Sequence, residues 1–516
     1  MSENQIRITT TIDLRRASIT VKGSIEKRVT NPTEFIVRNF TRVLLGVKNL
    51  NVSYTQNGGT VLPGYAMNSN MFGVSGSAPG FPFLLGWQDN KFPEKAIANN
   101  WLVQESQLNA AVAMTHTNSL SARLTFEPFT GMRINFTALR SFTENRTSYY
   151  IWDPTHNAGA GGYPQNLRSP LTSGTYSITV IALRSSFEKH DPKNNYRSAV
   201  FDKFTENRSA ISSRRANELQ KNNSSYTPTP IADGGYDGYS LEAQEVMIPA
   251  FYAAYMGRNP EKVSLKDFPS FLNMLPNWDL DFSGLSNFAF IKKYFRTVSI
   301  RHSYKATYSV GSYTTNPAFN ADVATAASIA RDLQNNFIPR NDIADANLNE
   351  TFNPLIGIDM TFLNSLTTRV QVIKSRLVAL GLGNLQMSEN NKSDIVVGVG
   401  YVFNQVPITI RTLDGDTKRL QSDLKVNADF KISDSKTHIR RIGAIDETTQ
   451  EQNILPVQAS AGNKQMSLNL QAAYNLSSNF TLMVHFDRII NTPFVSTSYK
   501  SYNTNFGFTM RFMLVQ

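Results

Sequence analysis

The residues able to carry chemistry are few and scattered. The sequence has six His and no Cys, which excludes thiolate nucleophiles, disulfides, zinc–thiolate sites and iron–sulfur clusters. The histidines show neither HxH nor HExxH spacing, and a metal site needs ligands that converge. We therefore predict neither a metal nor a cofactor.

Candidate acid–base and phosphate-binding motifs are equally weak. Asp279 and Asp281 alternate with apolar residues over 278–282, a pattern that favours a solvated strand face over a catalytic carboxylate pair. The Gly-rich stretches 158–162 and 233–238 lack the Lys-Ser/Thr and the strand–helix context of a phosphate loop. No G-x-S-x-G nucleophile elbow occurs. We expect no catalytic residue, and no enzyme.

The charge pattern argues against nucleic acid as a partner. The 516-residue chain carries a net charge of +11, yet only 18% of its residues are charged. Nucleic-acid binders usually gather Lys and Arg into one stripe, whereas here they are spread over polar strand faces and loops. Such cations fit better in the lining of a pore, or against lipopolysaccharide phosphates.

The elements that hold these residues are mainly strands. Apolar and polar residues alternate with period two in long runs, of which 298–310 and 506–514 are clear examples. Similar runs occur near 5–14, 17–29, 48–55, 119–126, 131–140, 175–184, 355–363, 366–374, 395–403, 422–432, 468–476 and 480–487. This pattern predicts roughly twelve to sixteen strands, many about ten residues long, the length that a tilted strand needs to cross a bilayer.

Connection lengths give a second signal. Short turns are predicted at 433–436 and 477–479, and long polar loops at 442–465 and 489–504. Outer-membrane barrels alternate in this way because their periplasmic turns are short and their extracellular loops are long. With the C-terminus in the periplasm, both long loops lie outside the cell.

A membrane-spanning sheet must close into a barrel, because every backbone N–H and C=O in hydrocarbon needs a partner within the protein. One face of each strand then meets lipid and the other meets water. The residues predicted to face lipid are Leu470, Tyr474, Leu482, Val484, Phe486, Phe506, Phe508 and Phe512. The residues predicted to face the lumen are Asn469, Gln471, Asn475, Thr509 and Arg511.

The predicted fold class is all-β, a transmembrane antiparallel β-barrel with short helical inserts. Helical spacing occurs at 193–219, at 242–257 with a break at Pro249, and at 319–334. Residues 1–516 are interpreted as one barrel domain, with loop and helical inserts near 56–100, 188–275 and 312–353.

Two alternatives remain open. No run of 18 apolar residues is present, and residues 5–14 read as a strand and not as a secretory signal. Alternation also occurs in β-sandwiches, whose apolar faces pack inward. The chain could thus be a smaller autonomous outer-membrane porin or receptor barrel, or a soluble surface protein rich in β structure that binds a partner.

Several segments together resemble the SprA/Sov family, the outer-membrane translocon of the type IX secretion system, which is also linked to gliding motility. The segments are TVLPGY (60–65), APGF (78–81), IPAFYAAY (248–255), LPNW (275–278), YSVGSY (308–313), PLIGIDMT (354–361), INTPFVSTSY (490–499) and NTNFGF (503–508). Their order extends over essentially the whole chain.

The resemblance implies a very large single-chain barrel of which this sequence is the C-terminal portion, so a signal peptide would belong to a preceding part. It also implies passive passage of folded cargo proteins that carry C-terminal signals, in the cell outer membrane. The implied partners are the cargo, the membrane lipid, and the plug and shuttle subunits of the secretion system. The resemblance assigns no catalytic residue.

Overall fold

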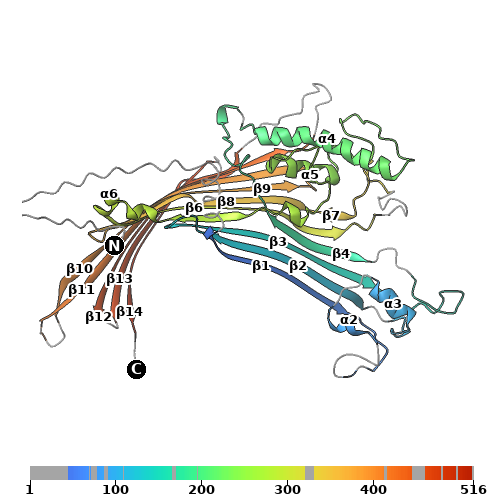
Figure 1. Cartoon of the computed structure of the whole chain (residues 1–516), viewed down its shortest axis with the longest axis horizontal. Coiled ribbons are helices and arrows are strands. Elements are labelled where there is room, and N and C mark those ends of the chain that lie inside the picture. Colours follow the sequence, from blue (N-terminus) through green and yellow to red (C-terminus); the bar gives the residue numbers. More distant parts are fainter. Residues whose placement is uncertain are drawn as a thin grey trace, which may run out of the picture. The chain divides into compact units, whose positions relative to one another are not determined.

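The computed structural model divides into two units, Met1–Gly46 and Val47–Gln516. It describes residues 45–513 except 69, 71–77, 87–90, 108–109, 165–169, 195, 320–329, 412–414, 416, 444–458, 478–479 and 495–497. The strands predicted near 5–14 and 17–29 lie outside the described residues, as does most of the helix predicted at 319–334. The helices and strands labelled in Figure 1 belong to the second unit.

One antiparallel sheet of 14 strands dominates the described residues (Figure 1). The strands are β1 (Val47–Val61), β2 (Ala111–Phe126), β3 (Met132–Tyr149), β4 (Leu171–Thr179), β5 (Asn277–Phe282), β6 (Phe295–Thr315), β7 (Asn341–Ile343), β8 (Asp345–Phe362), β9 (Thr367–Gly381), β10 (Gln386–Arg411), β11 (Thr417–Arg441), β12 (Ala459–Ser477), β13 (Phe480–Pro493) and β14 (Ser501–Phe512). The main order is β1-β2-β3-β4-β6-β8-β9-β10-β11-β12-β13-β14. The fold is thus all-β and antiparallel, as predicted and consistent with a barrel, and within the described residues the sheet ends at β1 and β14.

The helices are short except for one pair. They are α2 (Phe81–Leu84), α3 (Phe92–Ala98), α4 (Ala199–Asn222), α5 (Gln244–Tyr255) and α6 (Ala289–Lys292). The predicted helices at 193–219 and 242–257 correspond to α4 and α5 and are confirmed. Ser198 caps α4 by accepting a hydrogen bond from the Phe201 amide at 3.1 Å. Among the described helices, none is long and apolar enough to span a membrane.

The predicted break at Pro249 is wrong, because α5 continues through this residue. Pro has no N–H to donate to the carbonyl four residues earlier, so the Glu245 oxygen loses its intrahelical partner. Arg215 of α4 supplies a replacement, since its Nε donates to the Glu245 oxygen at 3.2 Å. The neighbouring helix therefore makes the proline tolerable.

The predicted turn at 433–436 is also wrong. β11 runs unbroken for 25 residues, and Ser433–Lys436 pair with β10 on one side and β12 on the other. Ser and Asp favour turns in isolation, but a ladder of backbone hydrogen bonds accepts polar side chains when neighbouring strands flank it. The loops predicted at 442–465 and 489–504 shorten accordingly to 442–458 and 494–500.

Connections differ between the two ends of the strands. At one end the strands are joined by 127–131, 283–294, 363–366, 412–416 and 478–479; we call this the short-turn end. At the other, the insert end, the connections are 62–110, 150–170, 316–340, 382–385, 442–458 and 494–500. Segment 180–276 leaves the sheet in the middle of the strands instead, because β4 and β5 lie end to end between β3 and β6. The insert end thus holds most of the long connections, as the predicted alternation requires. There are two exceptions: 382–385 at the insert end is short, and 283–294 at the short-turn end is longer than 494–500.

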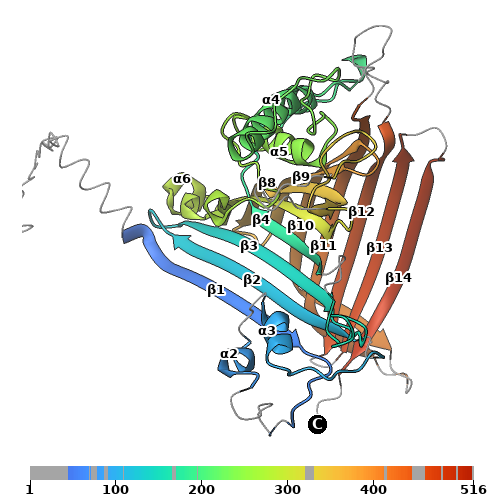
Figure 2. The same cartoon turned by 90° about the vertical axis from the view of Figure 1, so that its right-hand side faces the viewer.

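The hydrophobic core lies between the sheet and the insert formed by residues 180–276, which includes α4 and α5 (Figure 2). Phe251 and Tyr252 of α5 contact Tyr308 of β6, with ring centroids 6.4 Å and 5.1 Å apart. α4 packs on α5 through buried residues that include Phe204 and Ile211. Sheet and helices therefore form layers at the insert end.

Candidate lipid-facing wall

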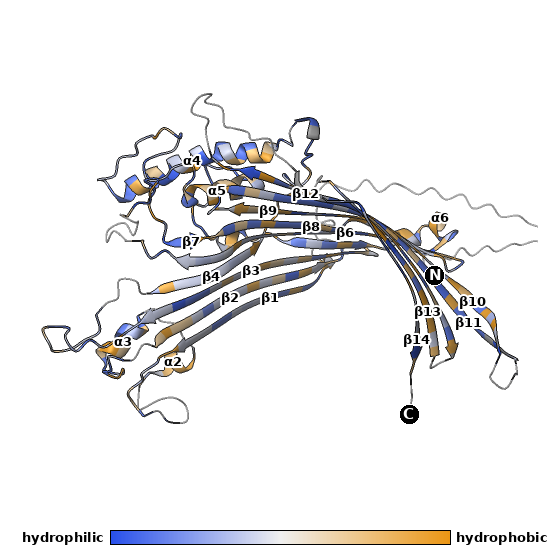
Figure 3. Cartoon of the chain, turned by 180° about the vertical axis from the view of Figure 1, so that it is seen from behind, coloured by the Kyte–Doolittle hydropathy of each residue, from blue (hydrophilic) through white to orange (hydrophobic). Residues whose placement is uncertain are grey.

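The register of β10–β14 sorts most apolar and most polar side chains onto opposite faces. Figure 3 shows hydrophobic and hydrophilic residues interleaved along the strands. We call the side with most apolar residues the apolar face. Its residues align across the five strands in five successive rows, which we call the apolar band. From the insert end these rows are Ile395–Ile432–Met466–Ile490–Tyr502, Val397–Phe430–Leu468–Arg488–Thr504, Val399–Ala428–Leu470–Phe486–Phe506, Tyr401–Val426–Ala472–Val484–Phe508 and Phe403–Leu424–Tyr474–Leu482–Met510.

The height of the apolar band suits a membrane. Ile395 to Phe403 is eight residue steps, about 27 Å along the strand at ~3.4 Å per residue. A strand tilt of about 40° reduces this to a vertical height of about 21 Å, close to the ~25 Å apolar band of outer-membrane barrels. Many of the band side chains also remain accessible: Phe506 is 69% exposed and Phe508 is 65% exposed.

All eight residues predicted to face lipid lie on the apolar face. Seven belong to the apolar band, and Phe512 follows one row further toward the short-turn end. Tyr474 differs in its surroundings, because it is 3% exposed and its hydroxyl donates to the Val406 oxygen at 2.8 Å. The Tyr474 side chain is thus occupied by the protein, and the prediction that it faces lipid is wrong for this residue.

The five residues predicted to face the lumen all lie on the opposite, polar face. Register places Asn469 beside Asp487, Gln471 beside His485, Asn475 beside Thr481, Thr509 beside Met483 and Arg511 beside Thr481. Asn469 donates a hydrogen bond to Asp487, and Thr481 donates to Asn475 at 3.0 Å. The polar face therefore carries side chains that hydrogen-bond across neighbouring strands. That water in a pore covers it stays a prediction.

The same apolar face has a different environment at the insert end. Tyr308, Leu348 and Val378 are neighbours in the register of β6, β8 and β9, and each is fully buried under the insert. The next row toward the short-turn end holds Glu350 and Arg376. The insert and the apolar band consequently occupy the same side of the sheet at different heights.

Buried ion pairs attach the first turn of the insert to the sheet. Arg376 and Glu350 lie 3.0 Å apart, with side chains 3% and 1% exposed. Glu350 also accepts hydrogen bonds from Tyr304 at 2.8 Å and from Ser186 at 2.6 Å, while Arg376 donates to the Ser185 oxygen at 2.6 Å. These contacts pair both buried charges, as burial of ions requires, although Arg376 Nε has no hydrogen-bond partner among the described residues.

A second buried ion pair holds the insert further along the chain, at His190 and Tyr196. Arg440 contacts Glu389 at 2.9 Å, and His190 contacts the other carboxylate oxygen at 3.2 Å. Arg440 also donates to the Tyr196 oxygen at 3.2 Å. The two pairs together fix the segment that leads into α4.

Two carboxyl groups inside the insert carry shifted pKa values. Burial raises the pKa of Glu245 on α5, and the nearby Arg215 opposes the shift only in part. Burial likewise raises the pKa of Asp267, whose Oδ1 has no hydrogen-bond partner among the described residues. The insert therefore holds two carboxyls that favour the protonated form.

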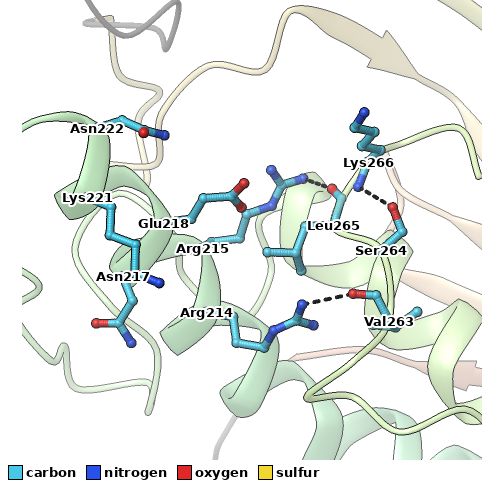
Figure 4. Close-up of a pocket in the computed structure, with 10 residues that line it drawn as sticks. All are labelled: Arg214, Arg215, Asn217, Glu218, Lys221, Asn222, Val263, Ser264, Leu265 and Lys266. Atoms are coloured by element: carbon cyan, nitrogen blue, oxygen red, sulfur yellow. Dashed lines mark hydrogen bonds between the residues drawn. The ribbon is translucent and has the colours of Figure 1, made fainter.

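A cleft of about 770 Å³ lies between α4 and the segment 263–266 (Figure 4). Its lining includes Arg214, Arg215, Lys221 and Lys266, so it is basic. Arg214 donates to the Val263 oxygen at 2.9 Å, and Arg215 donates to the Leu265 oxygen. Both guanidinium groups thus join the segment to α4, which makes them structural links.

The absence of catalytic groups stays a prediction, but the structure places the candidate pair. Asp279 accepts a hydrogen bond from Ser303 and lies 3.5 Å from Lys305, on the polar face of β5 and β6. Among the described residues, no group of three or more His, Asp or Glu is arranged to hold a metal ion. Sequence reasoning missed the Glu350–Arg376 and Glu389–Arg440 pairs, because only the strand register brings these charges together.

Neither a protein-family model nor a curated protein matches the sequence. Among solved structures, the chain is similar to in-vitro folded OmpT, an outer membrane protein from Vibrio cholerae in its trimer form, at 7% identity over 90% of this chain and 99% of that chain, with a TM-score of 0.20. It is similar to an anion-selective porin from Comamonas acidovorans at 8% identity over 74% and 86%, with a TM-score of 0.11. Both TM-scores are too low to establish a shared fold.

Proposed function

We propose that this chain forms part of the wall of a β-barrel in the outer membrane. The observation that carries the proposal is the apolar band, five aligned rows exposed on one face and backed by a polar face. A soluble sandwich would bury such a surface against a second sheet. Exposed to water, an apolar area of this size would promote association.

The two edges support a wall that further strands complete. Among the described residues, β1 pairs only with β2 and β14 pairs only with β13. In hydrocarbon, the outward N–H and C=O groups of an edge strand need a further strand as their partner. Long connections at the insert end support an orientation with that end outside the cell.

The finer proposal is a protein-conducting channel of the type IX secretion system. It rests on the resemblance of segments such as 248–255 and 490–499 to the SprA/Sov family. In this function the wall is a passive conduit without enzymatic activity, through which folded cargo with C-terminal signals passes. Plug and shuttle subunits would gate the pore and collect the cargo.

The membrane proposal is tested by single cysteines, because the chain contains none of its own. Phe508→Cys and Thr509→Cys are adjacent in β14 and lie on opposite faces. A nitroxide label at 508 should be accessible to oxygen dissolved in lipid, and a label at 509 to a water-soluble nickel complex. Equal exposure of both labels to the nickel complex, in a monomer that needs no detergent, would contradict the proposal and favour a soluble binding protein.

The translocon proposal needs a separate measurement of pore size. Planar bilayers that contain the complete barrel should show a conductance too large for a small-solute porin, and the pore should admit folded cargo once the plug subunit is removed. A small, solute-limited conductance from this chain alone would favour the smaller porin or receptor barrel.

A further inference from the structure

Cations collect on the apolar face at one boundary of the apolar band. The first row beyond the band toward the insert end is Lys374–Ser393–Asp434–Lys464–Thr492, and the next row is Arg376–Asn391–Lys436–Gly462. Lys500 directly precedes β14, and its Nζ lies 5.2 Å from the centroid of the Tyr502 ring. Lys374, Lys436, Lys464 and Lys500 are together called the cationic belt.

Among the described residues, Lys436 is the one lysine of the cationic belt that forms an ion pair with a carboxylate. Asp434 is the one carboxylate in these two rows, and it lies 3.2 Å from Lys436, with both side chains 41% exposed. Arg376, in contrast, is buried against Glu350 and is unavailable. Four lysines against one aspartate leave a net charge of +3 on this strip of surface.

Exposed aromatic rings accompany the belt. The Lys374 Nζ lies 4.6 Å from the centroid of Phe187, and the Lys436 Nζ lies 4.8 Å from the centroid of Phe494. Phe187 and Phe494 are 50% and 44% exposed. Aromatic rings and lysines are both common at the boundary between hydrocarbon and lipid headgroups. Each side chain has an apolar part that can lie against hydrocarbon and a part that is attracted to the headgroups.

The height of the belt matches the position of lipid phosphates. Adjacent rows on one face are two residues apart, about 7 Å along the strand. Lys464 and Lys374 thus lie about 7 Å beyond the first row of the band, where acyl chains end. On β10 and β11 the insert covers the same face only further on, from the rows of Glu389 and Met387. On β8 and β9 it already covers Phe352 and Arg376, so Lys374 lies at the edge of the insert.

We propose that the cationic belt binds the phosphate groups of a phosphorylated glycolipid, lipid A, in the outer leaflet. This inference rests on the proposed membrane function and on its orientation, with the insert end outside. The apolar band receives the acyl chains, and the lysines hold the phosphates between the band and the insert. The belt thereby fixes the depth of the wall in the bilayer.

The test uses the full chain in mild detergent and measures binding of diphosphorylated lipid A. A cation near an anionic lipid surface contributes about 1 kcal/mol, or about fivefold in affinity. Lys464→Gln should therefore weaken binding about fivefold, and the combined Lys374→Gln, Lys436→Gln and Lys464→Gln variant on the order of a hundredfold. Lys425→Gln is the matched control, because Lys425 is exposed on the polar face of β11 and should leave binding unchanged.

Competing outcomes separate the possible ligands and sites. Lipid A stripped of its phosphates should bind equally to wild type and to the triple variant. Loss of binding in Lys221→Gln with Lys266→Gln, but not in the triple variant, would assign the lipid to the α4 cleft and overturn the proposal. Inorganic phosphate that displaces lipid A at equal concentration would reveal a site for free anions and would also overturn it.

The label at position 508 distinguishes failure of this inference from failure of the proposed function. If that label is exposed to lipid and the triple variant still binds lipid A like wild type, the belt proposal fails while the membrane wall stands. If the label is exposed to water in bilayers, the membrane function fails and the belt proposal fails with it.

Discussion

The Glu350–Arg376 pair offers the sharpest test of how the insert is held. Glu350→Ala leaves Arg376 as a buried charge without its carboxylate, and removes an acceptor from Tyr304 and Ser186. Removing one partner of a buried ion pair costs about 3–5 kcal/mol. We expect the free energy of opening at the base of the insert to fall by this amount.

Hydrogen exchange measures that opening directly. The amides of Ser185 and Ser186 donate to Ala182 and Leu183 in the turn that the pair anchors. At 1.4 kcal/mol per factor of ten, their exchange should accelerate by roughly two to four orders of magnitude, provided that reclosing is faster than exchange. Amides of β2, far from this pair in the strand order, should exchange as in wild type.

Two control variants make the reasoning refutable. Glu127→Ala breaks the pair with Arg133, whose side chain is 62% exposed, and should cost under about 1 kcal/mol. Glu350→Leu combined with Arg376→Met replaces both charges and should recover most of the loss. If Glu350→Ala changes exchange by less than about threefold, or if the double replacement is as damaging as the single one, the pair is not what holds the insert.

Three further predictions concern the wall, the insert and the short-turn end. Phe508→Arg should reduce folding stability in liposomes by about 2–4 kcal/mol, and Thr509→Arg by less than about 1 kcal/mol, in urea titrations. Because burial raises the pKa values of Glu245 and Asp267, the protection from proteolysis that these two carboxyls contribute should be complete below about pH 4 and fall as pH rises through the raised values; Asp267→Asn should weaken this dependence relative to wild type, and an identical profile would contradict it. Phe290, 73% exposed in α6 at the short-turn end, should lie in the membrane interface, so a label at Phe290→Cys should be less accessible to water in bilayers than in the urea-unfolded protein.

Alternation predicted the strands and their two faces because side-chain direction in a strand has period two whatever the protein. It did not predict where strands end. β10 extends from Gln386 and β11 to Arg441, well beyond the alternating cores at 395–403 and 422–432. The added residues, such as Asn391 and Ser393, are polar and carry no periodic signal, yet their backbones pair fully.

The alternating pattern also could not predict which parts of each face are buried by other segments of the protein. Tyr304 and Tyr308 alternate just as Phe506 and Phe508 do, but the tyrosines are fully buried under the insert while the phenylalanines are more than 60% exposed. A period assigns a side chain to a face and says nothing of what covers that face. The tyrosines are buried because α5 packs on β6, which follows it closely in the sequence. β14 lies far from α5 in the sequence.

β10 passes through three environments on one face. Ile395 to Phe403 belong to the apolar band, Asn391 and Ser393 lie in the belt rows, and Met387 and Glu389 lie under the insert. A slip of one residue would exchange the faces of the whole strand, and a slip of two would move each row about 7 Å along it. The two-residue slip would carry Ser393 toward hydrocarbon and separate Glu389 from Arg440. The buried ion pair and the height of the apolar band therefore specify the same register, and a barrel wall built from this strand has a single depth at which both are satisfied.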